Sequence, residues 1–328
     1  MYSFGVASSE ASTRLERDSR VHRVRRTRQG ILTVTSVVRK QPGGSQSRLV
    51  RCDDGKLYVL KMNPNPQGPN VLANEAIGVM LIRGLGLPAP PWKPVAIDLK
   101  TVRFFPELAM QTANHETIFP ACGTHFGSEY LGGPQYDPHS FMPKHYRHIL
   151  RNPAQLLAIS LFDIWASHQD ERQCLYQRTG GTNLYDACFI DNGHLFGGPT
   201  WSDVAGRSRT VFSGNVPAPL AGDPTVEQWL RVFEDRIPKL LHHAVGTVPR
   251  EWYKNDIYTL YAHLLERLEC IRTLVNREVL NGSRSATVMN GRVASPPLVG
   301  LHELLMEGNA GYGSVEDRCG LRERLLGG

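Results

Sequence analysis

The sequence predicts an α+β fold with two lobes, a small antiparallel β lobe followed by a larger helical lobe. Residues 31–62 contain three short runs rich in β-branched and apolar residues, and turn-forming residues separate these runs. Beyond residue 152 the chain contains long stretches in which apolar residues recur at helical spacing. A strand-rich part that precedes a helix-rich part is typical of α+β proteins.

Three strands are predicted close to the amino terminus, with the sequences ILTVTSVVR, RLVRC and KLYVLKM. The Asp54–Gly55 pair separates the second run from the third, and an Asp-Gly pair favours a tight hairpin. The three strands are therefore expected to form an antiparallel meander. A further strand is expected at VAI (95–97), and the aromatic segment HFGSEYLGG (125–133) is expected to link the two lobes.

Helices are predicted where apolar residues follow a helical period. The first covers residues 71–86 and ends at Gly84 and Gly86. The second, PAQLLAISLFDIWASHQ (153–169), begins with proline and is apolar enough to be buried. Two short strands, LYQR and DACFID, come next, and two long helices are expected over residues 227–245 and 255–280.

The composition fits a folded chain with a sizeable core, because 41% of the 328 residues are hydrophobic and 21% are charged. No run of about 18 apolar residues occurs, so no membrane span is expected. The first residues lack the layout of a secretory signal. The six cysteines form no C-x-x-C pair, which indicates neither a zinc site nor a disulfide framework and predicts a cytoplasmic location.

The same patterns predict four segments: a basic tail over 1–28, the small lobe over 29–130, the helical lobe over 131–282 and a poorly ordered tail over 283–328. The net charge of +6 is unevenly distributed, with seven arginines from Arg14 to Arg28. Such an arm fits weak contact with nucleic acid or another anionic surface. A solvated terminus is the alternative, since no interleaved aromatic residue supports base stacking.

A lysine and a glutamate stand out in the first part of the chain. Lys61 ends the apolar strand LYVLK, and Glu75 lies in the following helix, directly after Asn74. A lysine in this position is able to pair with nucleotide phosphates while a glutamate holds it in place. A strand-end lysine that reaches solvent is the alternative. Asn74 is expected to cap or brace the glutamate.

A glycine-containing loop separates the first two predicted strands. Gly43, Gly44 and Ser45 lie in QPGGSQS, and glycine allows the backbone N–H groups to approach phosphate oxygens closely. A simple Gly-Gly hairpin turn explains the same residues. The loop over residues 63–70 is a second candidate for phosphate contact.

Two aspartates follow apolar segments in the second part of the chain. Asp170 comes after the buried helix, where a carboxylate is able to accept a proton from a substrate hydroxyl. Asp191 ends the strand ACFID before an Asn-Gly turn, and Gln173 or Asn192 is a second possible oxygen ligand for Mg²⁺. The alternatives are a helix-terminal aspartate and an ordinary Asx-turn. Asp163, inside the apolar helix, is expected to be structural and to need a buried partner.

The order of these charged groups is that of a protein-kinase-like phosphotransferase, and the segments that carry them resemble the HipA-like kinase superfamily in its short form, without the appended amino-terminal module. The matching segments run in order: YVLKM, LANEAIGVMLIRGLGLPAPP, HFGSEYLGG, FDIWASHQDERQ, FIDNGHLFGG and IPKLLHHAVGTVPREWY. The resemblance implies a two-lobed kinase-like fold that binds ATP and Mg²⁺ and phosphorylates a hydroxyl on a protein or small molecule.

The resemblance also implies roles for particular residues. Lys61 and Glu75 would hold the nucleotide phosphates, Glu129 and Tyr130 would lie near the adenine, Asp170 would be the catalytic aspartate and Asp191 the metal aspartate. The chain departs from the family at Gln173, which stands where the catalytic loop carries an asparagine. The longer amide arm motivates an alternative function, a catalytically weak pseudokinase-like binding or regulatory protein.

Overall fold

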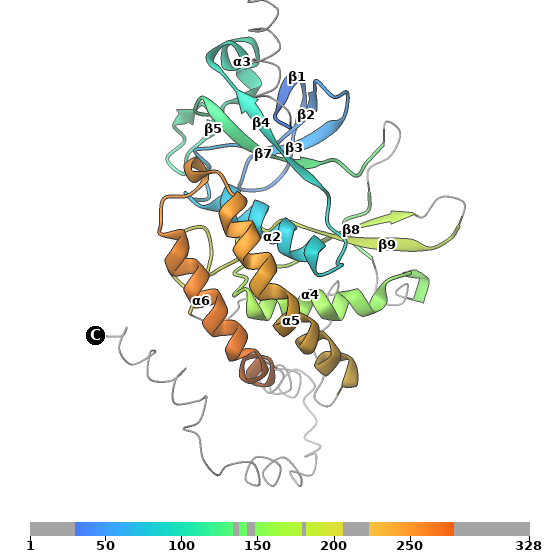
Figure 1. Cartoon of the computed structure of the whole chain (residues 1–328). Helices are drawn as coiled ribbons and strands as arrows, with labels where there is room; N and C mark the ends of the chain where they lie inside the picture. The colour runs from blue at the N-terminus through green and yellow to red at the C-terminus, as the bar shows by residue number, and fades with distance from the viewer. Residues whose placement is uncertain (1–29, 134–137, 143–147, 179–181, 206–222, 279–328) are drawn as a thin grey trace, which may run out of the picture. The chain divides into compact units, whose positions relative to one another are not determined.

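The computed structural model describes residues 30–133, 138–142, 148–178, 182–205 and 223–278 (Figure 1). Both predicted tails, 1–28 and 283–328, lie outside these residues. The described chain divides into two compact units. Unit 1 contains residues 30–66 and 91–130, and unit 2 contains residues 67–90 together with the described residues from 131 onward.

Unit 1 is built on a closed five-stranded β-barrel with the strand order β1, β2, β3, β7, β4. Its strands are β1 (Leu32–Lys40), β2 (Arg48–Cys52), β3 (Leu57–Lys61), β4 (Trp92–Ile97) and β7 (Gly123–Glu129). The antiparallel pairing of β1 with β2 and of β2 with β3 confirms the predicted meander. The expectation of a purely antiparallel lobe is corrected, because β1 and β4 pair in parallel. The chain between β1 and β4, which includes β2 and β3, has the length that a parallel pairing requires.

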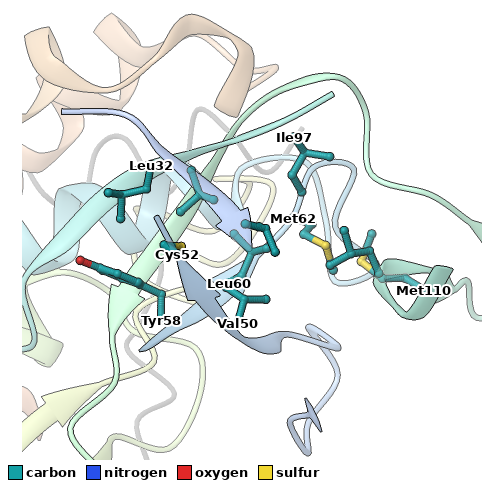
Figure 2. Packing of buried hydrophobic residues seen from close by; sticks show 11 residues of the cluster. Leu32, Val50, Cys52, Tyr58, Leu60, Met62, Ile97 and Met110 are labelled. Carbon is teal, nitrogen blue, oxygen red and sulfur yellow. The ribbon is translucent and has the colours of Figure 1, made fainter. Parts of the chain in front are cut away.

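The barrel interior is filled by apolar side chains from several strands (Figure 2). Tyr58 and Leu60 alternate along β3 and both point inward, as the period of two in a strand dictates. The Tyr58 hydroxyl donates a hydrogen bond of 2.8 Å to Asp54 Oδ2 in the β2–β3 turn. This turn, with Gly55 at a φ of 81°, is the one that the Asp-Gly pair predicted.

Short elements complete unit 1 between β4 and β7. They are α3 (Leu99–Phe104), the 3₁₀ turn η1 (Pro106–Leu108), β5 (Met110–Gln111) and β6 (Thr117–Ile118). Residues 125–129, expected in the connection between the lobes, instead belong to β7 and pair with both β3 and β4.

Unit 2 is mainly helical. Its elements are α2 (Val71–Gly84), α4 (Pro153–Trp165), β8 (Gln173–Arg178), β9 (Tyr185–Ile190), α5 (Pro224–Thr247), η3 (Arg250–Trp252) and α6 (Ile257–Glu269). Helix α5 packs against α2, α4 and α6 (Figure 1). The sequence predicts a single helix over residues 255–280, but α6 ends at Glu269, where a turn at Cys270 interrupts the helix.

Helix α6 fixes the carboxyl-terminal end of α4. Buried Arg267 donates hydrogen bonds to the carbonyl oxygens of Trp165 (2.6 Å) and Ile164 (2.7 Å). In return, the Trp165 indole N–H donates to Leu264 O at 3.1 Å. These bonds satisfy carbonyl groups that the helix end leaves without partners. The segment that follows α4 therefore starts from a fixed point.

Four described cysteines, Cys52, Cys122, Cys174 and Cys188, are free thiols. Among the helices of the described residues, none combines the length and the hydrophobicity that a bilayer-spanning segment needs.

Candidate functional site

The two predicted aspartates of unit 2 emerge at the same end of the β8–β9 hairpin. The antiparallel register pairs Gln173, the first residue of β8, with Ile190, the last residue of β9. Asp170 lies three residues before this pair along the chain, and Asp191 follows it directly. We call residues 166–172 the Asp170 loop and residues 191–198 the Asp191 loop.

Backbone hydrogen bonds join the two loops along their length. Gln169 N donates to His194 O at 2.9 Å, Phe196 N to Ala166 O at 2.7 Å and Gly197 N to Ser167 O at 3.0 Å. Buried backbone groups need such partners. The two loops therefore form one connected platform.

Left-handed backbone conformations concentrate in this platform. Ser167, Asp191 and Phe196 have φ values of 49°, 61° and 61°. Residues with a Cβ atom adopt this region rarely, at a cost of about 1–3 kcal/mol, and such residues cluster at functional sites. The sharp turn predicted at Asp191 is present, because its φ reverses the chain direction directly after β9.

Asp170 is exposed and carries no buried partner in the loop. Its Oδ1 accepts a hydrogen bond of 2.7 Å from the Glu171 amide. An exposed carboxylate on a fixed backbone is accessible to a substrate hydroxyl. The catalytic role of Asp170 stays a prediction.

Asp191 contacts the side chain predicted to share a metal with it. Gln173 Nε2 donates to Asp191 Oδ2 at 2.7 Å. A carboxylate and an amide oxygen are ligands that suit Mg²⁺, so the pair fits the predicted ion once the amide turns its oxygen inward. Asn192 is the weaker second candidate, because it is fully buried and its Oδ1 already accepts a hydrogen bond of 2.8 Å from Arg172.

Asp163 has the buried partner that the sequence analysis required. Its carboxylate accepts two hydrogen bonds from Arg172, at 3.0 Å from Nε and 2.5 Å from Nη2, and lies 3.4 Å from His168 Nδ1. Burial alone would raise the pKa of Asp163, but the Arg172 charge and then the His168 charge hold that pKa below its usual value. Arg172 shows the converse: burial opposes its charge, and Asp163 raises the Arg172 pKa.

Helix α2 is held to the Asp191 loop through Asn74. The buried Asn74 amide donates to the carbonyl oxygens of Gly193 (2.9 Å), Leu195 (3.0 Å) and Gly198 (3.2 Å). Its Oδ1 accepts a hydrogen bond of 2.6 Å from the Trp201 indole. Asn74 therefore braces the Asp191 loop, whereas the sequence analysis expected it to brace the glutamate.

Close packing reinforces this attachment of α2. A Cβ atom at Gly78 would lie 2.7 Å from Asn192 Cβ, so only glycine allows the helix and the loop to approach this closely. Glu75, buried on the same helix, shares this fixed position.

The remaining predicted residues lie in unit 1. Lys61 is buried at the end of β3, where its backbone pairs with Phe126 of β7. Because Lys61 and Glu75 belong to different units, their ion pair stays a prediction.

The glycine loop between β1 and β2 has two different parts. Gly43 has a φ of 105° and open space around its Cα, and Gly44 is exposed, whereas Ser45 is buried. Gln46 fastens the loop to β5, with Nε2 donating to Gln111 O at 2.7 Å and Oε1 accepting from Gln111 N at 3.0 Å. Such a loop leaves its glycine backbone exposed, which suits either phosphate contact or a simple turn.

Glu129 and Tyr130 are engaged within unit 1. Both Glu129 carboxylate oxygens bind Lys56 Nζ, at 2.9 and 3.0 Å. The amide groups of Glu129 and Tyr130 donate to Pro91 O at 2.8 Å and to Leu57 O at 2.9 Å. An adenine that hydrogen-bonds to these two amides would have to displace both bonds.

The structure thus brings Asp170, Gln173 and Asp191 together within unit 2. Sequence reasoning missed Arg172 as a part of this site. The available signal was the aspartate inside an apolar helix, which requires a buried cation, and Arg172 is the first arginine or lysine after Asp163.

Comparison with known proteins agrees with the predicted resemblance. Residues 34–189 match a family model described as HipA-like kinase, which confirms it over that segment. No curated protein matches the chain in a sequence comparison.

Three solved structures align with the chain at low sequence identity. The Helicobacter pylori proinflammatory kinase CtkA aligns with a TM-score of 0.50 and 13% identity, over 76% of this chain and 98% of that one. Hydra Fam20, solved with sugar, aligns at 0.48 and 15% over 78% and 88%. A Golgi casein kinase with Mn/ADP bound aligns at 0.48 and 14% over 78% and 74%. The CtkA alignment supports a kinase-like α+β fold and nothing finer.

Proposed function

We propose that this chain, whose residues 34–189 belong to the HipA-like kinase family, is an ATP- and Mg²⁺-dependent phosphotransferase that acts on a hydroxyl of a protein or small molecule. The observation that carries the proposal is the hydrogen-bonded platform that presents Asp170 and Asp191 at one end of the β8–β9 hairpin. Phosphoryl transfer requires positioned charges more than covalent chemistry from the protein.

In the proposed mechanism, exposed Asp170 orients the acceptor hydroxyl and receives its proton. Asp191 and Gln173 would hold Mg²⁺, which when bound neutralises charge on the phosphates. Lys61, kept in place by Glu75 in a two-lobed arrangement, would bind the nucleotide phosphates together with Gly43, Gly44 and Ser45. Glu129 and Tyr130 would lie beside the adenine.

The direct test is incubation of the protein with γ-labelled ATP, Mg²⁺ and cell lysate. Asp170→Ala and Asp191→Asn should each reduce label transfer on the order of a hundredfold or more, since both groups act on the reacting atoms. The matched control is Asp186→Asn, which makes the same change on β9 at a carboxylate that pairs with Arg151. Equal transfer by wild type and Asp191→Asn would remove Asp191 from the mechanism.

One observation favours a second function, that of a catalytically weak pseudokinase-like binding or regulatory protein. The side chain beside Asp191 is that of Gln173, whose amide arm is longer than that of asparagine and whose Nε2 lies 2.7 Å from Asp191 Oδ2. No thermal shift at millimolar nucleotide would favour this function, whereas a shift without phosphoryl transfer would be consistent with both functions. A thermal-shift experiment with ATP, with and without Mg²⁺, measures binding separately, because a ligand at a hundred times its Kd stabilises the folded state by about 2.7 kcal/mol.

A further inference from the structure

Arg172 is a fully charged group buried inside the platform, two residues after Asp170. Its side chain and the Asp163 side chain that it pairs with are both completely buried. Burial of an ion pair removes both charges from water, and apolar residues of similar size are often at least as stable. Stability alone therefore does not account for an arginine at this place.

The guanidinium contacts the chain on both sides of Asp191. Nη1 of Arg172 donates to Ile190 O at 2.9 Å and to Asn192 Oδ1 at 2.8 Å. Ile190 and Asn192 are the two neighbours of Asp191 along the chain. Arg172 therefore holds the chain on both sides of Asp191, whose backbone has a left-handed φ.

The opposite edge of the guanidinium is anchored to helix α4. Nε and Nη2 donate to the two Asp163 oxygens in a bidentate arrangement, which fixes the plane of the group as well as its position. Helix α4 is itself held by Arg267 of α6. The chain of contacts therefore runs from the helical body of unit 2 to the backbone around Asp191.

We propose that Arg172 is a positioning residue, which uses Asp163 as its anchor to set where the Asp191 carboxylate lies relative to Asp170. The proposal rests on the proposed phosphotransferase function and names a residue that acts on the two aspartates without touching substrate. Only a planar group with several directed N–H donors makes these contacts together, so lysine does not replace it.

The first variant is Arg172→Lys, which keeps the positive charge and removes the planar guanidinium with its several N–H donors. Activity or metal affinity should fall about 10- to 100-fold, the usual effect of losing a group that orients a metal ligand. We expect the loss to appear as a higher Mg²⁺ concentration for half-maximal turnover together with a lower kcat. The matched control is Arg267→Lys, an equally conservative change at a buried arginine that donates to carbonyl groups of α4. That control should lower the Tm and change the Mg²⁺ half-saturation less than Arg172→Lys does.

A double variant separates positioning from folding. Asp163→Leu combined with Arg172→Met removes both charges together, so no unpaired charge remains in the interior. It should remain folded, with a Tm lowered by the loss of the donors to Ile190 O and Asn192 Oδ1, and still show the loss of activity. A double variant with wild-type kcat and wild-type Mg²⁺ dependence would overturn the proposal.

Hydrogen exchange tests the inference without any turnover. Amides of residues 190–194 should exchange at least tenfold faster in Arg172→Lys than in the wild type, while those of α5 keep their protection. Unchanged exchange in 190–194 would overturn the positioning role even if ATP is consumed. If the wild-type protein transfers no phosphate, the proposed function fails, and the exchange result alone decides whether Arg172 sets the geometry of the Asp191 loop.

Discussion

The two units hold their predicted site residues in different ways. In unit 2 the loops around Asp170 and Asp191 are fixed by backbone pairing and by buried Asn74 and Arg172. In unit 1 the glycine loop is fastened at Gln46 and leaves Gly43 and Gly44 exposed. The first arrangement suits groups whose mutual geometry decides a rate, and the second suits a loop that adapts to a ligand.

This difference has a physical basis in how each region satisfies its polar groups. Buried donors and acceptors in unit 2 cost about 1–3 kcal/mol each when a partner is lost, so its geometry resists change. Exposed loop groups in unit 1 exchange a protein partner for water at little cost. Substitutions in the two regions should therefore differ in kind, with losses of stability and rate in unit 2 and mainly losses of nucleotide affinity in unit 1.

The largest effect on stability is expected for Asn74→Ala in unit 2. The change leaves the carbonyl groups of Gly193, Leu195 and Gly198 and the Trp201 indole without their present partner. Because each unsatisfied buried group is costly, we expect a loss of about 3 kcal/mol in the free energy of unfolding, measured by urea denaturation. Asn255→Ala is the control, since that residue accepts only one bond, from Asn70. Equal losses in the two variants would show that Asn74 is no special brace.

Lys61→Met tests whether unit 1 acts through nucleotide binding. The side chain keeps its apolar stem and loses its charge, so kcat/KM for ATP should fall on the order of a hundredfold, as for the loss of one charge-stabilising donor. Lys56→Met on the same hairpin is the control, because Lys56 is exposed and pairs with Glu129. Unchanged kinetics for Lys61→Met would contradict the role of this lysine.

The sequence predicted the local elements and the need for a buried partner at Asp163. Strand and helix periods act over a few residues, so the β1–β3 meander and α4 are readable from spacing. An acid inside an apolar helix predicts a counter-charge by elementary electrostatics. Both expectations depend on residues near one another in the chain.

The contacts that organise the site depend on residues far apart along the chain, and these were not predictable. Asn74 bonds to the Asp191 loop, which lies more than a hundred positions away in the sequence. The acceptors are backbone carbonyl groups, which every residue has, so the sequence does not distinguish them. Parallel pairing of β1 with β4 likewise depends on the path of the connection between them. No residue type in the sequence identifies these hydrogen-bond and strand-pairing partners, so they are known only from the folded structure.

Acid titration probes the buried pair of unit 2. The folded-state pKa of Asp163 is lowered, so the pair contributes stability that is fully present above about pH 3.9, the ordinary pKa of aspartate. That contribution is lost as the pH falls through the folded-state pKa, because the carboxyl group must then be protonated. The Asp163→Leu, Arg172→Met variant should therefore lose less stability than the wild type between pH 5 and about pH 2, measured as the urea midpoint. Parallel curves for the two proteins would show that the pair contributes nothing to the acid sensitivity.

The smallest effect is expected at the glycine loop of unit 1. Gly43→Ala places a Cβ at a φ of 105°, where side chains are strained although no atom lies in the way. We expect a loss of about 1 kcal/mol in the free energy of unfolding, set by the backbone alone. If the loop contacts phosphate, KM for ATP should also rise, whereas Gly86→Ala, with a φ of 81° and similar open space in unit 2, should cost similar stability and leave KM unchanged. Identical KM values for both variants would identify QPGGSQS as a simple turn, and the contrast between an adaptable loop in unit 1 and a fixed platform in unit 2 would lose its functional meaning.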